Sequence, residues 1–522
     1  MGVFEDNIEK MRVGFPELYQ RFNRITPDMI PSETLVGHVS ETEADEWLTD
    51  QPDPISKNIL IFGLANTILT GSIIAACKDE SKILIYEPSL MNFIYALGEF
   101  DLSFCFQKGV RLLVDGLNDD LFLGVMEEML DFRSYRDYQV YALPGVSEAF
   151  PEQRKRLIEH FAAEGIGWME GRRQTERYRL HESVENLVNN VALFGKGISG
   201  KSLDGVIPKD VPVILVGAGP SLKEDIDTLK KVKDRAFIVV ADTALKYALE
   251  QGLTPDAFVS IEPKRPITDF EDDRVMDIPM FCRINTMKWL MDKHRAKKIF
   301  MHEEDAFVRE IYRRYSIPEP LYRGGVNQLT QLFSLFDELC METVILVGQD
   351  MCYGESGESY IMKRESPNDD REKKTVKNNL GQDVTTRLDW YDMIRWYDNA
   401  LVEIDIKRVI NASGKGAKLQ GTTYMPLTDA IDKYGKDHQN FGSILDSVRT
   451  IENISKGFDA EEIRKTLKTE LAEFKNDSAK YEKDRTGSLL GGLLYKYEIA
   501  DEKGDIPESV KSGLSEIDKL LG

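Results

Sequence analysis

The glycine-rich turn Gly217-Ala218-Gly219-Pro220-Ser221 has the composition of an anion site. It follows four apolar residues at 213–216, and its two glycines allow a tight turn and a close approach of backbone to a ligand. Ser221 is expected to start a helix over 222–231, whose free N–H groups and positive dipole end attract phosphate. We expect Gly217, Gly219, Pro220 and Ser221 to hold a nucleotide phosphate; a purely structural turn explains the pattern equally well.

Polar residues also end the next two predicted strands. Asp242 and Thr243 follow the apolar run 237–241, and Glu262 lies at the end of the run 255–263. An acidic residue at the end of the second strand of a nucleotide-binding unit is placed to hold a ribose hydroxyl, so Asp242 and Thr243 are the candidate ribose ligands. Polar ends on successive strands indicate an open parallel sheet that presents this edge to a ligand.

Further along the chain, Gly324-Gly325-Val326-Asn327 precedes a helix with an apolar face at 329–339, which makes a second potential phosphate-binding helix start. The strand at 343–347 ends on Gly348 and Asp350, and the stretch 409–417, which contains Asn411, is expected to be a strand that ends in a glycine loop. We therefore include these residues in the predicted site. The polar stretch 354–387 is too long for a passive turn, and we interpret it as a lid or insertion.

Composition limits the function classes. The chain has 522 residues, 42% of them apolar, as in a soluble protein of two to four domains. Its formal charge of −22 disfavours nucleic acids and anionic membranes as partners. No apolar run reaches the about 20 residues of a membrane span, and no signal peptide is recognisable, so we expect a cytoplasmic location. The five cysteines and six histidines are scattered without metal-ligand spacing, so no metal ligands are predicted.

The elements that position these residues form an α/β protein. A second unit opens with a strand at 58–62 and Gly63, and its next strand ends at Glu87, a spacing close to that from Gly217 to Asp242. Only one glycine of that turn is present, so a structural role is favoured there. We predict Rossmann-like domains at 1–195 and 196–430, with a bridging helical segment at 152–194 and a linker at 196–210, followed by a helical domain at 431–522.

Taken in order, these motifs resemble the motility-associated factor (Maf) flagellin glycosyltransferases over roughly residues 55–430. The central part also resembles bacterial sialyltransferases that use a CMP-sugar donor and, more loosely, archaeal 6-hydroxymethylpterin diphosphokinases. The resemblance is carried by Gly217–Leu222, Pro255-Asp256, Gly324-Gly325-Val326, Leu346–Asp350, Ile410–Ala417 with Gly421-Thr422, and, near the N-terminus, Phe62-Gly63 and Ile85–Pro88.

The resemblance implies a Rossmann-like central glycosyltransferase domain. It implies transfer of a pseudaminic- or legionaminic-type nonulosonic acid from its CMP form to Ser or Thr of flagellin, in support of flagellum assembly and motility. The CMP-sugar is then a substrate rather than a permanently bound cofactor, and dependence on a divalent metal stays open. The alternatives are a pterin- or thiamine-type diphosphokinase that uses ATP and Mg²⁺, and a non-catalytic flagellin-binding protein.

The sequence departs from the family at one position. Many relatives carry a histidine shortly after the Gly-Gln-Asp strand exit, where this chain has Gly357-Glu358-Ser359-Tyr360. Asp350, Glu262 and Tyr360 are therefore the candidate catalytic residues. We expect Asp350 to face the sugar or the acceptor hydroxyl across the crevice from the Gly217 turn; the alternative is that it caps the turn that follows it in the sequence.

Overall fold

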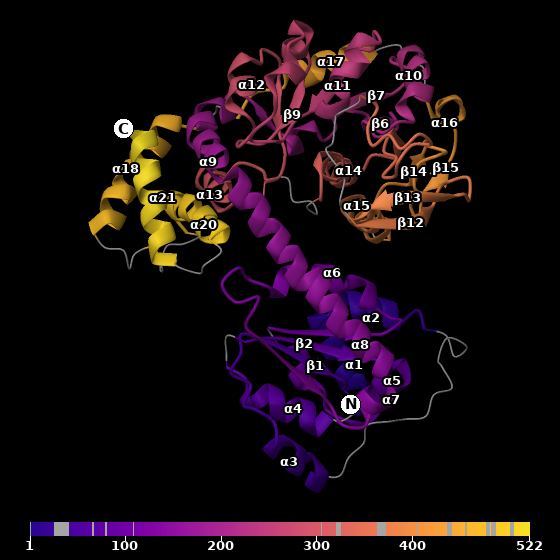
Figure 1. Cartoon of the computed structure of the whole chain (residues 1–522), viewed down its shortest axis with the longest axis vertical. Coiled ribbons are helices and arrows are strands. Elements are labelled where there is room, and N and C mark those ends of the chain that lie inside the picture. Colours follow the sequence, from indigo (N-terminus) through magenta and orange to yellow (C-terminus); the bar gives the residue numbers. More distant parts are fainter. Residues whose placement is uncertain are drawn as a thin grey trace. The chain divides into compact units, whose positions relative to one another are not determined.

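The structure is a computed structural model, and its helices and strands are drawn in Figure 1. It describes residues 2–25, 41–64, 67–78, 81–107, 109–303, 305–319, 325–362, 372–402, 404–435, 441–454, 457–476, 481, 487–501 and 506–522. These residues form two compact units, Met1–Thr175 and Glu176–Gly522. The three-domain division stays a prediction. None of the described helices is long and apolar enough to cross a membrane.

The first unit contains a four-stranded parallel sheet in the order β3-β2-β1-β4. Every residue of β1 is buried, which explains why its last four residues, 59–62, are all apolar. The predicted strands of this unit are confirmed. Its strands are β1 (Asn58–Phe62), β2 (Lys82–Glu87), β3 (Val110–Val114) and β4 (Tyr138–Ala142), and its helices are α1 (Val3–Gly14), α2 (Pro16–Phe22), α3 (Glu41–Thr49), α4 (Thr67–Ala76), α5 (Leu90–Glu99), α6 (Phe122–Met129), α7 (Val146–Ala149) and α8 (Pro151–His160).

The second unit is built on a nine-stranded sheet in which all pairings are parallel, in the order β15-β14-β11-β6-β7-β8-β9-β10-β5. The α/β fold class is therefore confirmed. The strands are β5 (Ile198–Ser199), β6 (Val213–Val216), β7 (Phe237–Ala241), β8 (Ala257–Val259), β9 (Met280–Cys282), β10 (Lys298–Phe300), β11 (Thr343–Val347), β14 (Arg408–Asn411) and β15 (Thr423–Tyr424).

The sheet has a topological switch point between β6 and β11. From β6 the chain builds outward through β7, β8, β9 and β10, and it then returns to place β11 and β14 on the other side of β6. In open parallel sheets, ligands bind beyond the carboxyl ends of the strands near such a point. The fold thus brings the predicted residues after β6, β7, β8 and β11 to one edge.

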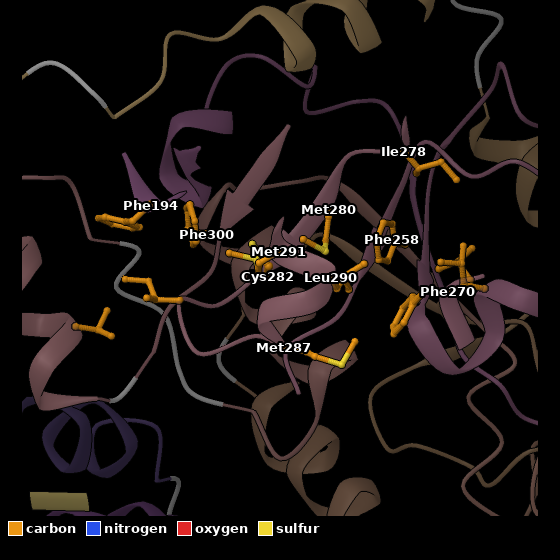
Figure 2. Packing of buried hydrophobic residues seen from close by; sticks show 14 of the residues in the cluster. Phe194, Phe258, Phe270, Ile278, Met280, Cys282, Met287, Leu290, Met291 and Phe300 are labelled. Carbon is orange, nitrogen blue, oxygen red and sulfur yellow. The ribbon is translucent and has the colours of Figure 1, made fainter. Parts of the chain in front are cut away.

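An apolar core covers each face of this sheet. Along β6, Ile214 and Val216 belong to one core and Val213 and Leu215 to the other, because successive side chains of a strand point to opposite faces. Figure 2 shows part of the first core, where Phe258, Met280, Cys282 and Leu290 gather. Besides the C-terminal helices described next, the helices that contribute to the first core are α9 (Gly167–Phe194), α10 (Leu222–Lys231), α11 (Asp242–Glu250), α12 (Lys288–Lys293), α13 (Ala306–Tyr315) and α16 (Leu427–Tyr434). Those that contribute to the second core are α14 (Gln328–Glu338), α15 (Leu388–Ala400) and α17 (Phe441–Thr450).

The tail is helical, as predicted, with α18 (Ala460–Asn476), α20 (Leu489–Ala500) and α21 (Ile506–Leu521). Its buried side chains join the first core of the sheet, and α20 packs closely on α13. A Cβ on Gly492 would lie 2.4 Å from the backbone N of Phe307, so a glycine is required at this contact.

The structure corrects one interpretation of the sequence, the linker, and describes part of a second, the lid. The stretch 196–210 is not a linker, because it contains β5, which pairs with β10 at the sheet edge. The predicted lid at 354–387 contains an antiparallel hairpin of β12 (Lys373–Lys377) and β13 (Asp383–Arg387). Residues 363–371 of the predicted lid lie outside the described residues.

Candidate active site at the carboxyl edge of the central sheet

The glycines after β6 pack against the exit of β11. The N–H of Gly217 donates to the carbonyl of Val347 at 2.8 Å, and the N–H of Gly219 donates to that of Gly348 at 2.7 Å. A Cβ on Gly217 would lie 2.5 Å from the Gly348 oxygen, and one on Gly219 would lie 2.6 Å from Cγ of Asp350. Gly348 itself has a φ of +61°. In this structure the close approach that the glycines permit is made to the exit of β11, and phosphate binding at this turn stays a prediction.

Asp350 is 5% exposed and fills the anion position at the start of α10. The backbone N–H of Ser221 donates to its Oδ2 at 2.7 Å, and the Ser221 hydroxyl donates to its Oδ1. Burial raises the pKa of Asp350, and the two bonds from Ser221 oppose that shift. Asp350 therefore lies against the glycine turn. The expectation that it lies across a crevice from this turn is wrong.

Two other predicted residues lie beside this turn. Pro220 faces the following loop, since a Cβ on Gly354 would lie 3.3 Å from its Cβ. Asn411 is buried, and its Oδ1 accepts a hydrogen bond from the N–H of Ser413 at 3.1 Å. The Ser413 hydroxyl lies 3.2 Å from that of Ser221. Both residues thus support the packing of the turn in this structure.

The second predicted phosphate-binding helix start, that of α14, has N–H groups that donate to its own N-cap residue. Asn327 is the N-cap of α14, and its side-chain oxygen accepts from two N–H groups of the first turn in a capping box with Thr330. A Cβ on Gly325 would lie 2.4 Å from Oγ1 of Thr330. Val326 is 46% exposed, and Gly324 lies outside the described residues. In this structure Asn327 occupies two N–H groups of the first turn of α14, and phosphate binding at this helix start stays a prediction.

Asp242 joins three elements at the ends of β7 and β8. It is 2% exposed and lies at the start of α11, with Thr243 half-buried beside it. Its Oδ2 accepts from the hydroxyl of Ser260 at 2.9 Å, and its Oδ1 accepts from Nε2 of Gln328 at 2.8 Å. Nε of Arg265 lies 3.5 Å from Oδ2. The Asp242 carboxylate therefore links Ser260, Gln328 and Arg265 at the carboxyl edge of the sheet, next to the switch point.

Glu262 is the predicted catalytic carboxylate that solvent reaches best. Its side chain is 28% exposed, and its Oε2 lies 2.6 Å from NH1 of Arg179. Burial raises the pKa of Glu262, and the charge of Asp242 adds to the shift; Arg179, Arg265 and Arg283 counteract it. A carboxylate with a raised pKa that solvent reaches is suited to take a proton.

Tyr360 lies on the segment that covers the glycine turn, where the N–H of Ile361 donates to the carbonyl of Ala218 at 2.8 Å. The Tyr360 hydroxyl accepts from NH2 of Arg387 at 3.1 Å. The Arg387 guanidinium in turn lies 3.7 Å from the ring centroid of Trp390. Tyr360 is thus held by a buried arginine, and these contacts fit a positioning role.

Sequence reasoning missed several functional candidates at this edge. Ser260 and Arg283 directly follow buried strands, so the rule that identified Asp242 could have found them. Gln328 adjoins the predicted Asn327, whereas Arg179 comes from α9 and no local signal marks it. Within the part of the chain that the structure describes, no three His, Cys, Asp or Glu side chains gather in a way that could hold a metal ion.

Comparisons with known proteins agree with this architecture. Residues 185–356 match the family model described as 6-hydroxymethylpterin diphosphokinase MptE-like, a range that holds Asp242, Glu262 and Asp350. A segment of 51 residues is 41% identical to an uncharacterised protein of Treponema pallidum (strain Nichols), and covers 10% of this chain and 24% of that protein. A Maf glycosyltransferase structure from Magnetospirillum magneticum AMB-1 aligns with a TM-score of 0.51 and 12% identity, over 99% of this chain and 94% of that one. The predicted resemblance is confirmed: residues 185–356 match the MptE-like model, and the chain has a fold similar to that of the Maf glycosyltransferase structure.

Proposed function

We propose that this protein is a glycosyltransferase that moves a nonulosonic acid from a CMP donor to Ser or Thr of flagellin. We further propose that it acts in the cytoplasm, with no permanently bound cofactor. The fold likeness to a Maf glycosyltransferase extends over nearly the whole chain and supports the reaction class. The observation that carries the proposal is Glu262, a partly exposed carboxylate among arginines at the ligand-binding edge of a parallel sheet.

In this reaction Glu262 serves as the general base. It takes the proton of the acceptor hydroxyl as the oxygen bonds to the anomeric carbon and the bond from that carbon to the CMP phosphate breaks. Its raised pKa brings it closer to neutral pH, where a base is most effective, and the ion pair with Arg179 holds its carboxylate in place. The same carboxylate can stabilise the positive charge that develops on the sugar ring.

The positive charges around Glu262 suit an anionic donor. The chain carries a net charge of −22, so a CMP-sugar must be held by local groups, and Arg179, Arg265 and Arg283 all act on this carboxylate. Arginine donors placed where the phosphate leaves would stabilise its developing charge. We keep Asp242 and Thr243 as the proposed ribose ligands, because they end the strand between the glycine turn and the strand of Glu262.

The direct test is to incubate the purified protein with flagellin and a CMP-nonulosonic acid and to measure the intact mass of flagellin. We expect mass increments of one sugar residue each with the wild type and none with Glu262→Gln. Absence of any increment with the folded wild-type protein, across pseudaminic, legionaminic and sialic acid donors, contradicts the proposal.

One observation favours a second candidate, a pterin diphosphokinase: the description of the family model that matches residues 185–356. This enzyme would need ATP, Mg²⁺ and a hydroxymethylpterin. Because a ligand that binds only the native state raises the melting temperature, thermal shifts separate the two candidates. We expect stabilisation by CMP; a larger shift with ATP and Mg²⁺, together with formation of a pterin diphosphate, favours the kinase.

A further inference from the structure

Arg283 is the residue that directly follows β9 at the edge of the proposed site. It is half-buried, and its Nε is inaccessible to solvent and has no hydrogen-bond partner. Among the residues that the structure describes, its guanidinium forms no hydrogen bond and no ion pair. Its backbone N–H, by contrast, donates to the Thr286 hydroxyl at 2.9 Å, so the main chain at this position is held firmly.

An unpaired arginine at this depth costs stability, because it loses water contacts without gaining protein partners. The neighbouring arginines do not share this feature: Arg265 pairs with Asp242, and Arg179 pairs with Glu262. The five N–H donors of a guanidinium form a rigid fork that matches the two oxygens of a carboxylate or phosphate. Unlike these two arginines, Arg283 is therefore available to an anion.

The neighbours of Arg283 place that anion close to the proposed chemistry. Glu262 follows β8, which pairs with β9, and adjacent strands lie about 4.8 Å apart. On the other side, Glu303 follows β10, and its Oε2 accepts from the N–H of Ile284 at 3.2 Å. Its Oε1 is buried without a partner and can accept from a hydroxyl. An unpaired arginine on the strand next to that of Glu262, with an unpaired acceptor on the strand beyond, suits a ligand that is both acidic and hydroxylated.

We propose that Arg283 binds the anionic oxygens of the donor, the carboxylate of its acidic sugar or the phosphate of its CMP group, next to the reacting carbon. This inference rests on the proposed glycosyltransferase function and adds a residue that discriminates acidic sugars from neutral ones. Arg283 takes no part in bond making, and its contribution is to hold and orient the donor.

The test measures binding by calorimetry with three probes: CMP-N-acetylneuraminic acid, CMP, and free N-acetylneuraminic acid. The proteins are the wild type, Arg283→Gln, Arg283→Lys and a control, Arg295→Gln, which removes an exposed arginine paired with Asp273 and Asp277. We expect Arg283→Gln to weaken binding of the CMP-sugar by at least about 10-fold, as loss of a bidentate charged contact does. The Lys variant retains the charge but not the fork and should be intermediate, and Arg295→Gln should bind like the wild type.

The simpler probes identify the source of the anion. Weaker binding of N-acetylneuraminic acid alone assigns Arg283 to the carboxylate, and weaker binding of CMP alone assigns it to the phosphate; either result supports the proposal. Equal affinity of the wild type and Arg283→Gln for the CMP-sugar overturns this inference while leaving the proposed function in place. A folded wild type that binds none of the probes overturns both.

Stability provides a further check. Because Arg283 has no protein partner, its replacement by Gln should leave the melting temperature unchanged or raise it by a few degrees, as is common for residues kept for function. A lower melting temperature would reveal a structural role, and the Lys variant would then carry the binding comparison.

Discussion

The glycine turns of the two units have the same arrangement of backbone donor and carboxylate acceptor. Each follows a buried strand, and each has an N–H group that donates to a carboxylate from the exit of a neighbouring strand. In the first unit, Glu87 accepts from the N–H of residue 64, after Gly63, at 2.6 Å. In the second, Asp350 accepts from the N–H of Ser221 at 2.7 Å. Glu87 is fully buried and Asp350 is 5% exposed, so both anion positions hold the protein's own carboxylate.

The difference between the units lies in the charges nearby. In the first unit, Arg156 pairs with Asp115 and contacts the hydroxyl of Tyr86, which itself donates to Asp115. In the second, Glu262 is partly exposed and Arg283 has no partner among the described residues. The two units therefore share a filled glycine turn and differ in the charged groups at the other strand exits of their sheets. Under the proposed function, the exits of β8 and β9 hold the donor, and four predictions test charged groups in the two units.

The largest effect is expected for Glu262→Gln. Removal of a general base lowers the rate by about 10²–10⁴-fold, whereas binding of CMP should persist because the nucleotide contacts other groups. Since the pKa of Glu262 is raised, wild-type turnover should fall as the pH drops through a value above that of an ordinary glutamate. Steady-state kinetics on flagellin measure both effects.

The exposed Glu271 provides the matched control for that experiment, since Glu271→Gln makes the same chemical change at a residue that is not part of the proposed site. Near-normal turnover of Glu262→Gln would remove its catalytic role and return Tyr360 and Asp350 to consideration.

The second prediction compares two ion pairs, one in each unit. Lys496 is 8% exposed and its Nζ lies 3.0 Å from both Glu176 and Asp305; burial lowers its pKa, but these two carboxylates outweigh that effect and raise it. Lys496→Met leaves the carboxylates buried without a partner and should cost about 3–5 kcal/mol of unfolding free energy. Arg156→Met breaks the more exposed pair with Asp115 and should cost about 1 kcal/mol or less. Denaturant unfolding that gives equal costs contradicts this comparison.

The third prediction concerns Asp256, at the amino end of β8 and away from the proposed site. It is 4% exposed; its Oδ2 accepts from the N–H of Ile238 at 2.8 Å, and its Oδ1 has no partner. Burial raises its pKa to about 7. The native state therefore holds this proton more tightly than the unfolded chain, whose aspartate pKa is about 3.9, and stability should fall as pH rises from about 4 to about 7.

The shift of about 3 pKa units corresponds to at most about 4 kcal/mol across that range. Asp256→Asn cannot titrate and should lose this part of the pH dependence while keeping an oxygen for the N–H of Ile238. Unfolding curves of the two proteins at pH 4, 5.5 and 7 measure the difference. Parallel pH profiles would mean that Asp256 keeps an ordinary pKa in the folded protein.

Much of this fold was predictable because its strands are buried on both faces. The runs at 213–216 and 237–241 are wholly apolar, and the helix at 222–231 has the bounds expected from its sequence. β5 was missed because a two-residue edge strand depends on its pairing with β10, which the local sequence does not encode. The contact between Ser221 and Asp350 joins residues 129 positions apart, so no local pattern indicates that the anion position is filled.

The smallest effects are expected for the two carboxylates with which the comparison began. Asp350→Asn keeps an oxygen that can accept from Ser221, but its NH₂ group meets a donor where the second oxygen stood. We expect a loss of about 1–3 kcal/mol in unfolding free energy, and the same for Glu87→Gln in the first unit. Both variants should keep turnover within a few-fold of the wild type at temperatures where they are folded. If Asp350→Asn instead loses about 100-fold in turnover while Glu87→Gln does not, Asp350 leaves its cap during the reaction and acts on the substrate.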